Sequence, residues 1–132
     1  MTRAGPISLR ERFAALRFLA DRTPETDAET GEGAFAELSP CNGGGVYIAH
    51  FAGNSEWERH RSGDEPVLVV EGAATLVLLV DGAEVHNRLR EGELLVVPKG
   101  TWHRFIVPEG VKLLTVTPQP TDHSAGSPDD SA

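Results

Sequence analysis

Residues 92–103 read GELLVVPKGTWH and residues 57–72 read WERHRSGDEPVLVVEG, and together these two segments decide the predicted fold. Each combines a run of aliphatic residues with a turn made of Gly, Pro, Ser, Asp or Lys. Short apolar runs bounded by such turns indicate β-strands. Each segment also carries histidine or glutamate beside its turn, so the two segments supply the two halves of a predicted metal site.

The chain from Val46 onward alternates β-rich runs with turn signals, about one turn in every ten residues, which is typical of an antiparallel sandwich or barrel. The expected strands are 46–51, 67–70, 75–80, 84–89, 94–97, 103–107 and 111–117. The expected turns are Glu71-Gly72, Asp81-Gly82, Glu91-Gly92, Lys99-Gly100 and Glu109-Gly110. Asp81-Gly82 is the strongest hairpin signal, because a type I′ turn needs positive φ at both central residues.

The length of 132 residues suits one domain, which we divide into three parts. Residues 1–45 are expected to form an N-terminal arm and loops packed on the barrel. Within them, residues 8–20 are expected to be helical because Ser8 and Glu11 form a capping-box pattern, although an extended arm is the alternative. Residues 46–117 are the barrel, and residues 118–132 are polar and are expected to be a flexible tail.

Composition excludes some classes of partner. Twelve basic and twenty acidic residues give a net charge of -8, which argues against nucleic acid or an anionic membrane surface. The longest apolar run, Leu76 to Val80, is too short to span a membrane. The single cysteine, Cys41, permits no internal disulfide. We see no signal peptide and expect a soluble cytoplasmic protein.

Four side chains are expected to converge. Glu58 and His60 lie two residues apart, so they share a face of an extended strand. The turn sequence at 62–64 allows the next strand to return Glu65 to that face. His103 follows a distant turn, and closure of the barrel could bring it opposite the other three. Two imidazoles with one or two carboxylates are suitable ligands for Fe(II), Mn(II), Ni(II) or Zn(II).

Both segments resemble the cupins, a family of small double-stranded β-helix, or jelly-roll, proteins. The second family motif is matched at every glycine, proline and histidine spacing, by Gly92, Pro98, Gly100 and His103. The first is matched in part, by Gly53, His60, Glu65 and Gly72. The chain departs from the family at two positions: Glu58 stands in place of the first motif histidine, and Val107 in place of a terminal asparagine.

The resemblance implies an all-β jelly-roll barrel that holds a divalent metal with the set Glu58, His60, Glu65 and His103. It implies a small-molecule ligand or substrate, and oxygenase, isomerase or lyase chemistry if the protein is an enzyme. A non-catalytic sensing or binding cupin is one alternative. A degenerate cupin, in which these residues hydrogen-bond one another without metal, is the other. The resemblance also implies a homodimer, for which strand Thr75–Val80 could supply the interface.

The remaining aromatic and histidine residues receive smaller roles. Trp57 and Trp102 are expected to face away from the metal ligands and to pack in the core or an interface, by alternation along their strands. Tyr47 and Phe105 are possible pocket-lining residues. The residues expected at the surface or in loops are His50, His86 and His123.

Overall fold

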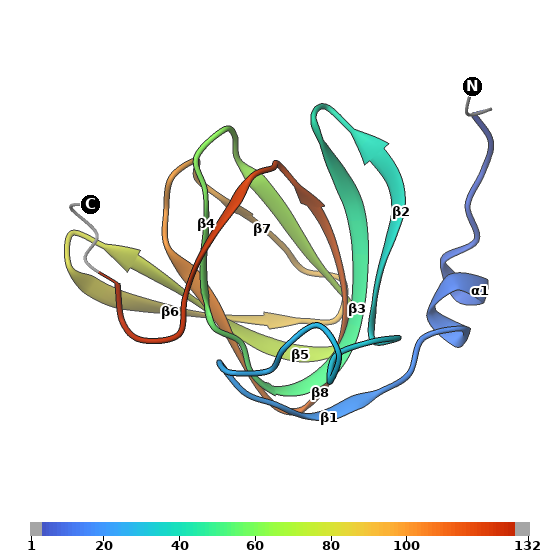
Figure 1. Cartoon of the computed structure of the whole chain (residues 1–132), viewed down its shortest axis with the longest axis horizontal. Coiled ribbons are helices and arrows are strands. Elements are labelled where there is room, and N and C mark those ends of the chain that lie inside the picture. Colours follow the sequence, from blue (N-terminus) through green and yellow to red (C-terminus); the bar gives the residue numbers. More distant parts are fainter. Residues whose placement is uncertain (1–3, 129–132) are drawn as a thin grey trace.

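The computed structural model describes residues 4–128, which form one short helix beside a nine-stranded, open-ended β-barrel (Figure 1). The helix α1 spans Leu9–Ala14. The strands are β1 (Leu19–Arg22), β2 (Phe35–Cys41), β3 (Gly44–Asn54), β4 (Trp57–His60), β5 (Glu65–Val80), β6 (Ala83–Arg90), β7 (Leu94–Val97), β8 (His103–Thr117) and β9 (Thr121–Ser124). The all-β prediction is confirmed. In this part of the chain no helix is long and apolar enough to cross a membrane.

Strand β8 organises the barrel. It pairs antiparallel with β3 along one edge and with β5 along the other. Strand β4 joins β8 where Glu58 pairs with His103, and β9 pairs with the opposite edge of β4. Strands β6 and β7 both pair with β5. The topology therefore brings the start of β8 together with β4 and β5, from which it is well separated in sequence.

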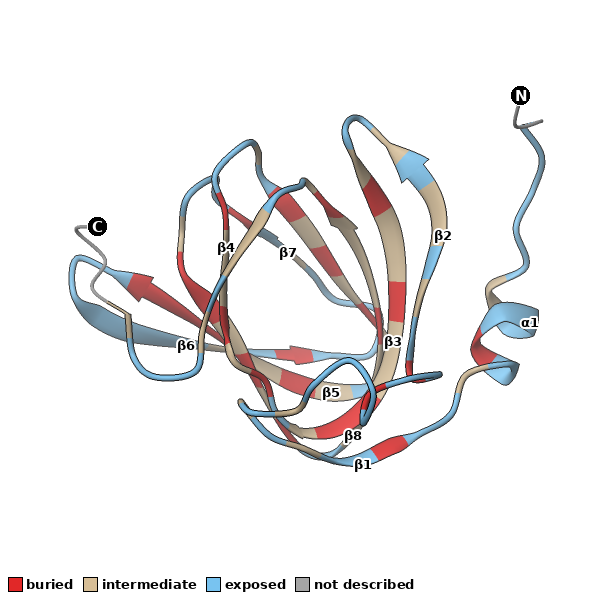
Figure 2. Cartoon of the chain, in the orientation of Figure 1, coloured by how far each residue is buried: buried red, intermediate tan, exposed pale blue. Residues whose placement is uncertain are grey.

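The core follows the alternation expected of strands with one face turned inward. Buried and partly exposed residues alternate along the first part of β5 and most of β8, whereas β6 is almost entirely exposed (Figure 2). The main core cluster has Phe51, Leu76 and Phe105 among its members. On β8 every buried residue has an odd number, on both sides of the segment 108–110, so a single face of this strand lines the interior.

A second, smaller cluster lies on the outer face of β5. Trp57, Val77, Leu79 and Trp102 form it. The guanidinium of Arg59 lies 4.6 Å from the Trp102 ring centroid, and that of Arg104 lies 5.2 Å from the Trp57 ring centroid. The prediction that both tryptophans pack away from the metal ligands is confirmed. Because this cluster covers Val77 and Leu79, the chain itself buries most of the strand that we expected at a dimer interface.

The N-terminal region combines the two alternatives predicted for it. The Ser8 cap is confirmed, since the Glu11 amide donates to Ser8 Oγ at 3.2 Å. The helix ends at Ala14, however, because the chain then extends as β1 and pairs in parallel with β3. Leu19 in β1 is buried in the core, which holds this strand on the barrel. The region also contains β2, which pairs antiparallel with β3.

Two of the predicted turns are wrong. Asp81-Gly82 is a hairpin turn, with φ of 50° and 79°, as predicted. Glu71-Gly72 and Glu109-Gly110, in contrast, lie inside the continuous strands β5 and β8, where the pairing shifts register. Gly72 has φ of 85°, and a Cβ atom there would collide with the carbonyl oxygen of Gly110. These glycines therefore allow irregular, bulged pairing between two long strands.

The C-terminal stretch is more ordered than the predicted flexible tail. Thr121–Ser124 forms β9 because its backbone pairs with β4. Asp122 reinforces the pairing through ion pairs with Arg59 at 3.0 Å and Arg61 at 2.8 Å. The polar composition of residues 118–132 gave no sign of this strand, because backbone pairing with β4 and the ion pairs of Asp122 stabilise it instead of apolar side chains. Residues 129–132, which were part of that prediction, lie outside the described residues.

Candidate metal centre and cavity

Three strand ends position the centre. His60 ends β4, Glu65 begins β5 and His103 begins β8. The two motif turns that precede Glu65 and His103 are tied to each other, because the Lys99 amide donates to Asp64 Oδ1 at 2.7 Å. The Gly100 amide also donates to the His60 carbonyl at 2.9 Å. These hydrogen bonds fix the relative positions of the two sequence segments and so of their metal-site side chains.

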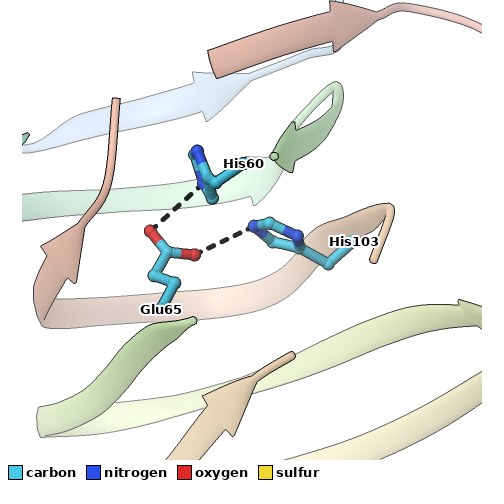
Figure 3. A group of neighbouring side chains, drawn as sticks. All are labelled: His60, Glu65 and His103. Carbon is cyan, nitrogen blue, oxygen red and sulfur yellow. Dashed lines mark ion pairs between the residues drawn. The ribbon is translucent and has the colours of Figure 1, made fainter. Parts of the chain in front are cut away.

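Glu65 lies between the two imidazoles (Figure 3). Its Oε2 atom is 3.4 Å from His60 Nε2, and its Oε1 atom is 3.0 Å from His103 Nε2. One potential ligand atom from each of the three residues lies within 4.8 Å of the others. Three of the four predicted metal ligands are thus brought together.

Contacts behind the centre fix each side chain. The His103 Nδ1 atom lies 3.0 Å from the Thr101 carbonyl oxygen, which can only accept a hydrogen bond, so Nδ1 carries the proton. His60 Nδ1 lies 3.0 Å from Thr121 Oγ1. Thr117 donates to Glu65 Oε2 at 2.6 Å. Both imidazoles therefore direct Nε2 toward Glu65, as metal-ligating histidines do when the other ring nitrogen is held by the protein.

Burial makes the charges of this cluster depend on one another. His60, Glu65 and His103 are only 3%, 5% and 1% exposed. Burial alone would raise the pKa of Glu65, but polar contacts with His103 and His60 and their positive charge lower that pKa from 4.5 to about 2. Burial opposes protonation of His103, yet Glu65 outweighs burial and raises the pKa of His103. Glu65 is therefore a carboxylate across the ordinary pH range.

The donor set fits a divalent metal ion. Among the described residues, Glu65 Oε1 has no aligned hydrogen-bond donor, although His103 Nε2 lies within ion-pair distance. A buried carboxylate oxygen without a donor is costly unless a charge compensates it. Two imidazole Nε2 atoms and one carboxylate match the preferences of Fe(II), Mn(II), Ni(II) and Zn(II), and a cation between them would satisfy the oxygen.

Glu58, the fourth predicted ligand, lies outside this group. It pairs with His103 across β4 and β8 and lines the neighbouring cavity. Its parity with His60 places it on the interior side, as predicted. Glu58 lies two residues before His60 on β4, and its side chain therefore faces the cavity instead of the metal centre.

A cavity of about 210 Å³ adjoins the centre. Tyr47 and Phe105, the predicted pocket residues, both line it. Sequence reasoning missed Arg22 and Phe35, since no motif marks the N-terminal strands that carry them. It also missed Thr117, which shares the odd-numbered face of β8 with His103 and could have been found by parity had β8 been read as one strand.

The other histidines and the cysteine stay outside the centre. His86 pairs with Glu84 at 3.2 Å, and His123 pairs with Glu56 at 2.6 Å. The His50 ring packs against Phe18 with ring centroids 4.7 Å apart. Cys41 is unpaired and partly buried. All three histidines lie in strands and not in loops; His86 and His123 are exposed, as predicted, whereas His50 is partly buried.

Comparisons of the sequence and the structure with known proteins identify a family that this chain matches. A family model described as the cupin domain matches residues 47–117, slightly more than half of the chain. The YdbB protein of Bacillus subtilis is 35% identical over 68 residues, which cover 51% of this chain and 57% of that protein. The match thus spans less than two thirds of that relative.

Several solved structures share the fold. A cupin-2 domain protein from Shewanella frigidimarina has 20% identity and a TM-score of 0.64, over 86% of this chain and 94% of its own. A Neisseria meningitidis protein has 23% identity and a TM-score of 0.63, over 87% and 100%. Hydroquinone 1,2-dioxygenase from Sphingomonas sp. TTNP3, with 4-hydroxybenzoate bound, has 20% identity and a TM-score of 0.55, over 65% of each chain. The jelly-roll prediction is confirmed by this shared architecture.

Proposed function

Because the chain belongs to the cupin family, we propose that it binds a divalent metal ion through His60, Glu65 and His103 and takes a small molecule into the adjacent cavity. The observation that carries this proposal is the convergence of three buried side chains whose potential ligand atoms lie within 4.8 Å of one another. An exposed acidic cluster would be ordinary. A buried group of two histidines and one glutamate, with both histidines held through Nδ1, favours a metal centre.

Two histidines and one carboxylate are the donor set of non-haem Fe(II) centres, so iron is the first metal to test, followed by Mn, Ni and Zn. A metal here would supply Lewis-acid or oxygen-activating chemistry. The protein's own residues hold the imidazoles and the carboxylate in place and bury all three side chains. Glu58, facing the cavity, is proposed as a carboxylate available to a ligand or to the outer side of the metal.

The chemistry that follows from metal binding is also a proposal. The Sphingomonas dioxygenase, which shares the fold, has 4-hydroxybenzoate bound, and this supports a small molecule as the ligand class proposed for the present chain. Oxygenase, isomerase or lyase activity on a small molecule is the enzymatic form of the proposal, and non-catalytic binding or sensing is its alternative. Turnover assays of metal-loaded protein with candidate substrates distinguish the two.

Elemental analysis tests the metal centre. The full chain is expressed with Fe, Mn, Ni and Zn supplements, purified, and compared with His60→Ala, His103→Ala and Glu58→Gln. We expect near-stoichiometric metal in the wild type and in Glu58→Gln, and loss of metal in both alanine variants. His86→Ala is the matched control, since this exposed histidine pairs with Glu84 outside the centre. Metal-free wild-type protein after all four supplements would overturn the proposal in favour of the degenerate cupin.

Two further expectations remain proposals. We propose a homodimer, for which the exposed Leu94 and Val96 of β7 are better candidates than Thr75–Val80. Among the described strands β7 pairs only with β5, so its other edge is open. Sedimentation equilibrium should give a dimer that Leu94→Asp with Val96→Asp converts to a monomer, and a monomeric wild type would contradict this. We also propose a cytoplasmic location, supported by the single cysteine and testable by cell fractionation.

A further inference from the structure

A second cationic group faces the cavity beside the metal centre. Arg22 in β1 lines the cavity, and its guanidinium lies 4.5 Å from the Phe51 ring centroid and 4.9 Å from that of Phe35. The ion pairs found within residues 4–128 do not include Arg22. Aromatic faces hold a guanidinium by cation–π attraction without neutralising it. Arg22 therefore enters the cavity as a positioned cation without a bound carboxylate.

The surroundings of Arg22 differ from those of a surface arginine. Burial lowers the pKa of Arg22, while the charges of Glu58 and Glu56 act in the opposite direction. An arginine stays protonated even so, because its pKa is far above neutrality. A desolvated guanidinium without an ion-pair partner retains most of its capacity to bind an anion.

The charges around the cavity do not balance once a metal is present. The arginine, acidic and histidine side chains that line it are Arg22, Glu58, Glu65 and His103. With a divalent ion and neutral imidazoles, the metal and Arg22 together exceed the two carboxylates by one positive charge. A monoanionic ligand would neutralise the enclosed site, whereas a neutral or cationic ligand would leave it charged or worsen the excess.

We propose that Arg22 binds the carboxylate of a small monoanionic acid whose other end faces the metal centre. This inference rests on the proposed function and names its ligand class. The planar guanidinium matches a carboxylate through two parallel hydrogen bonds. Phe35, Phe51, Phe105 and Leu113 give the intervening wall an apolar character, which suits an aromatic or aliphatic body. The cavity volume of about 210 Å³ restricts the acid to a small one.

Paired acids and amides test the ligand class. Benzoate and 4-hydroxybenzoate are titrated into the metal-loaded full chain, with benzamide and 4-hydroxybenzamide as neutral counterparts of the same shape. Calorimetry gives the affinities, and the Nε–Hε signal of Arg22 in the ¹⁵N-labelled protein reports contact with the guanidinium. We expect at least one acid to bind about tenfold or more tightly than its amide and to shift the Arg22 signal. Acids that bind no better than amides, or that leave this signal unmoved, overturn the proposal.

Variants on the two charges should act in opposite directions. Arg22→Met should raise the Kd of the acid about 10- to 100-fold and leave the amide unchanged, because it removes charge-assisted hydrogen bonds. The Kd of the acid for Arg22→Lys should lie between those of the wild type and Arg22→Met, since lysine keeps the charge but cannot form the two parallel hydrogen bonds of a guanidinium. Glu58→Gln should tighten acid binding by removing a repulsive carboxylate. Arg90→Met, an exposed arginine of β6, is the matched control and should change nothing. Unchanged acid affinity in Arg22→Met would refute the inference.

Metal content separates this inference from the proposed function. Arg22→Met that keeps its metal but loses acid binding supports both. Wild-type protein without metal refutes the metal proposal, and acid binding by that protein, lost in Arg22→Met, would leave the arginine site standing. If Arg22→Met fails to fold in thermal melts, Arg22→Lys and the wild-type Arg22 signal still decide the question.

Discussion

At the scale of single residues, the centre is a compromise between burial and charge. Glu65 is held ionised by two histidines, although it is almost inaccessible to water. The same arrangement that prepares the ligands for a cation also lets the metal-free protein compensate its own buried charge. In the proposed metal-loaded state, the cation would take over the charge compensation that the two histidines provide here.

The metal-free protein should be most stable in mildly acidic solution. The folded-state pKa of Glu65, about 2, lies below its ordinary value of 4.5, so its contribution is complete above pH 4.5 and is lost as pH falls toward 2. The pKa of His103 is raised above 6.5, so its contribution is present below pH 6.5 and is lost as pH rises through the folded-state pKa. Urea unfolding midpoints measured against pH with a chelator present test this. His103→Gln should lose the decline above pH 6.5, and a variant that keeps it would contradict the assignment.

Thr117 should set metal affinity without being a ligand. Its hydroxyl donates to Glu65 Oε2 at 2.6 Å, which orients the carboxylate. Removing such a partner of a ligand typically costs about 10- to 100-fold in metal affinity, and we expect a loss in that range for Thr117→Val. Competition with a chromophoric chelator measures it. Thr75→Val, the same substitution on β5 away from the centre, should leave the affinity unchanged.

At the scale of elements, much of the interior is formed by β5 and β8, two long strands that bend at their register shifts but remain continuous. The Gly72 and Gly110 positions let β5 and β8 continue past their register shifts, so one face of each keeps lining the core. Glu65 and Thr117 lie at one end of the β5–β8 ladder, and His103 pairs with Leu78 at the other end, so the bending of the two strands is what brings Glu65 within 3.0 Å of His103.

Gly72→Ala should destabilise the barrel more than Gly92→Ala. Both glycines have nearly the same backbone, with φ of 85° and 83°, so alanine costs about 1–2 kcal/mol of strain at either position. At Gly72 the new methyl group also collides with Gly110, whereas at Gly92 no atom lies within 4 Å. We expect a further loss of about 1–3 kcal/mol at Gly72, measured by chemical unfolding. Equal losses in the two variants would show that the close strand approach is unimportant.

Residue spacing and turn residues in the sequence predicted those elements whose structure depends on neighbouring residues in the chain. The span of β7, the hairpin at Asp81-Gly82 and the approach of His60, Glu65 and His103 all followed from spacing, turn residues and strand parity. Strands β1 and β9 could not be found this way, because they are held by pairing to distant strands and by ion pairs such as that of Asp122. Arg22 was missed for the same reason, since only the parallel pairing of β1 with β3 carries it to the cavity.

At the scale of the whole molecule, the proposed metal would link β4 and β5, which follow one another in the chain, to β8, which lies far from both in sequence. His60, Glu65 and His103 come from β4, β5 and β8, and β8 already pairs with both of the others. A ligand that binds only the folded chain stabilises it by mass action, whatever its chemistry. Because these three strands share most of the barrel's pairing, the stabilisation should be felt in global unfolding and not in one loop.

Removing the metal should therefore lower the melting temperature of the entire domain. At a free metal concentration 100 times the Kd the stabilisation is about 2.7 kcal/mol, which corresponds to roughly 10 °C for a domain of this size. Calorimetry of metal-loaded protein before and after dialysis against a chelator measures the shift, which metal addition should reverse. His103→Ala should melt at the same temperature with or without metal, because it lacks a metal ligand and cannot be stabilised by metal binding. His86→Ala should respond like the wild type, and an equal response in His103→Ala would place the bound metal elsewhere on the chain.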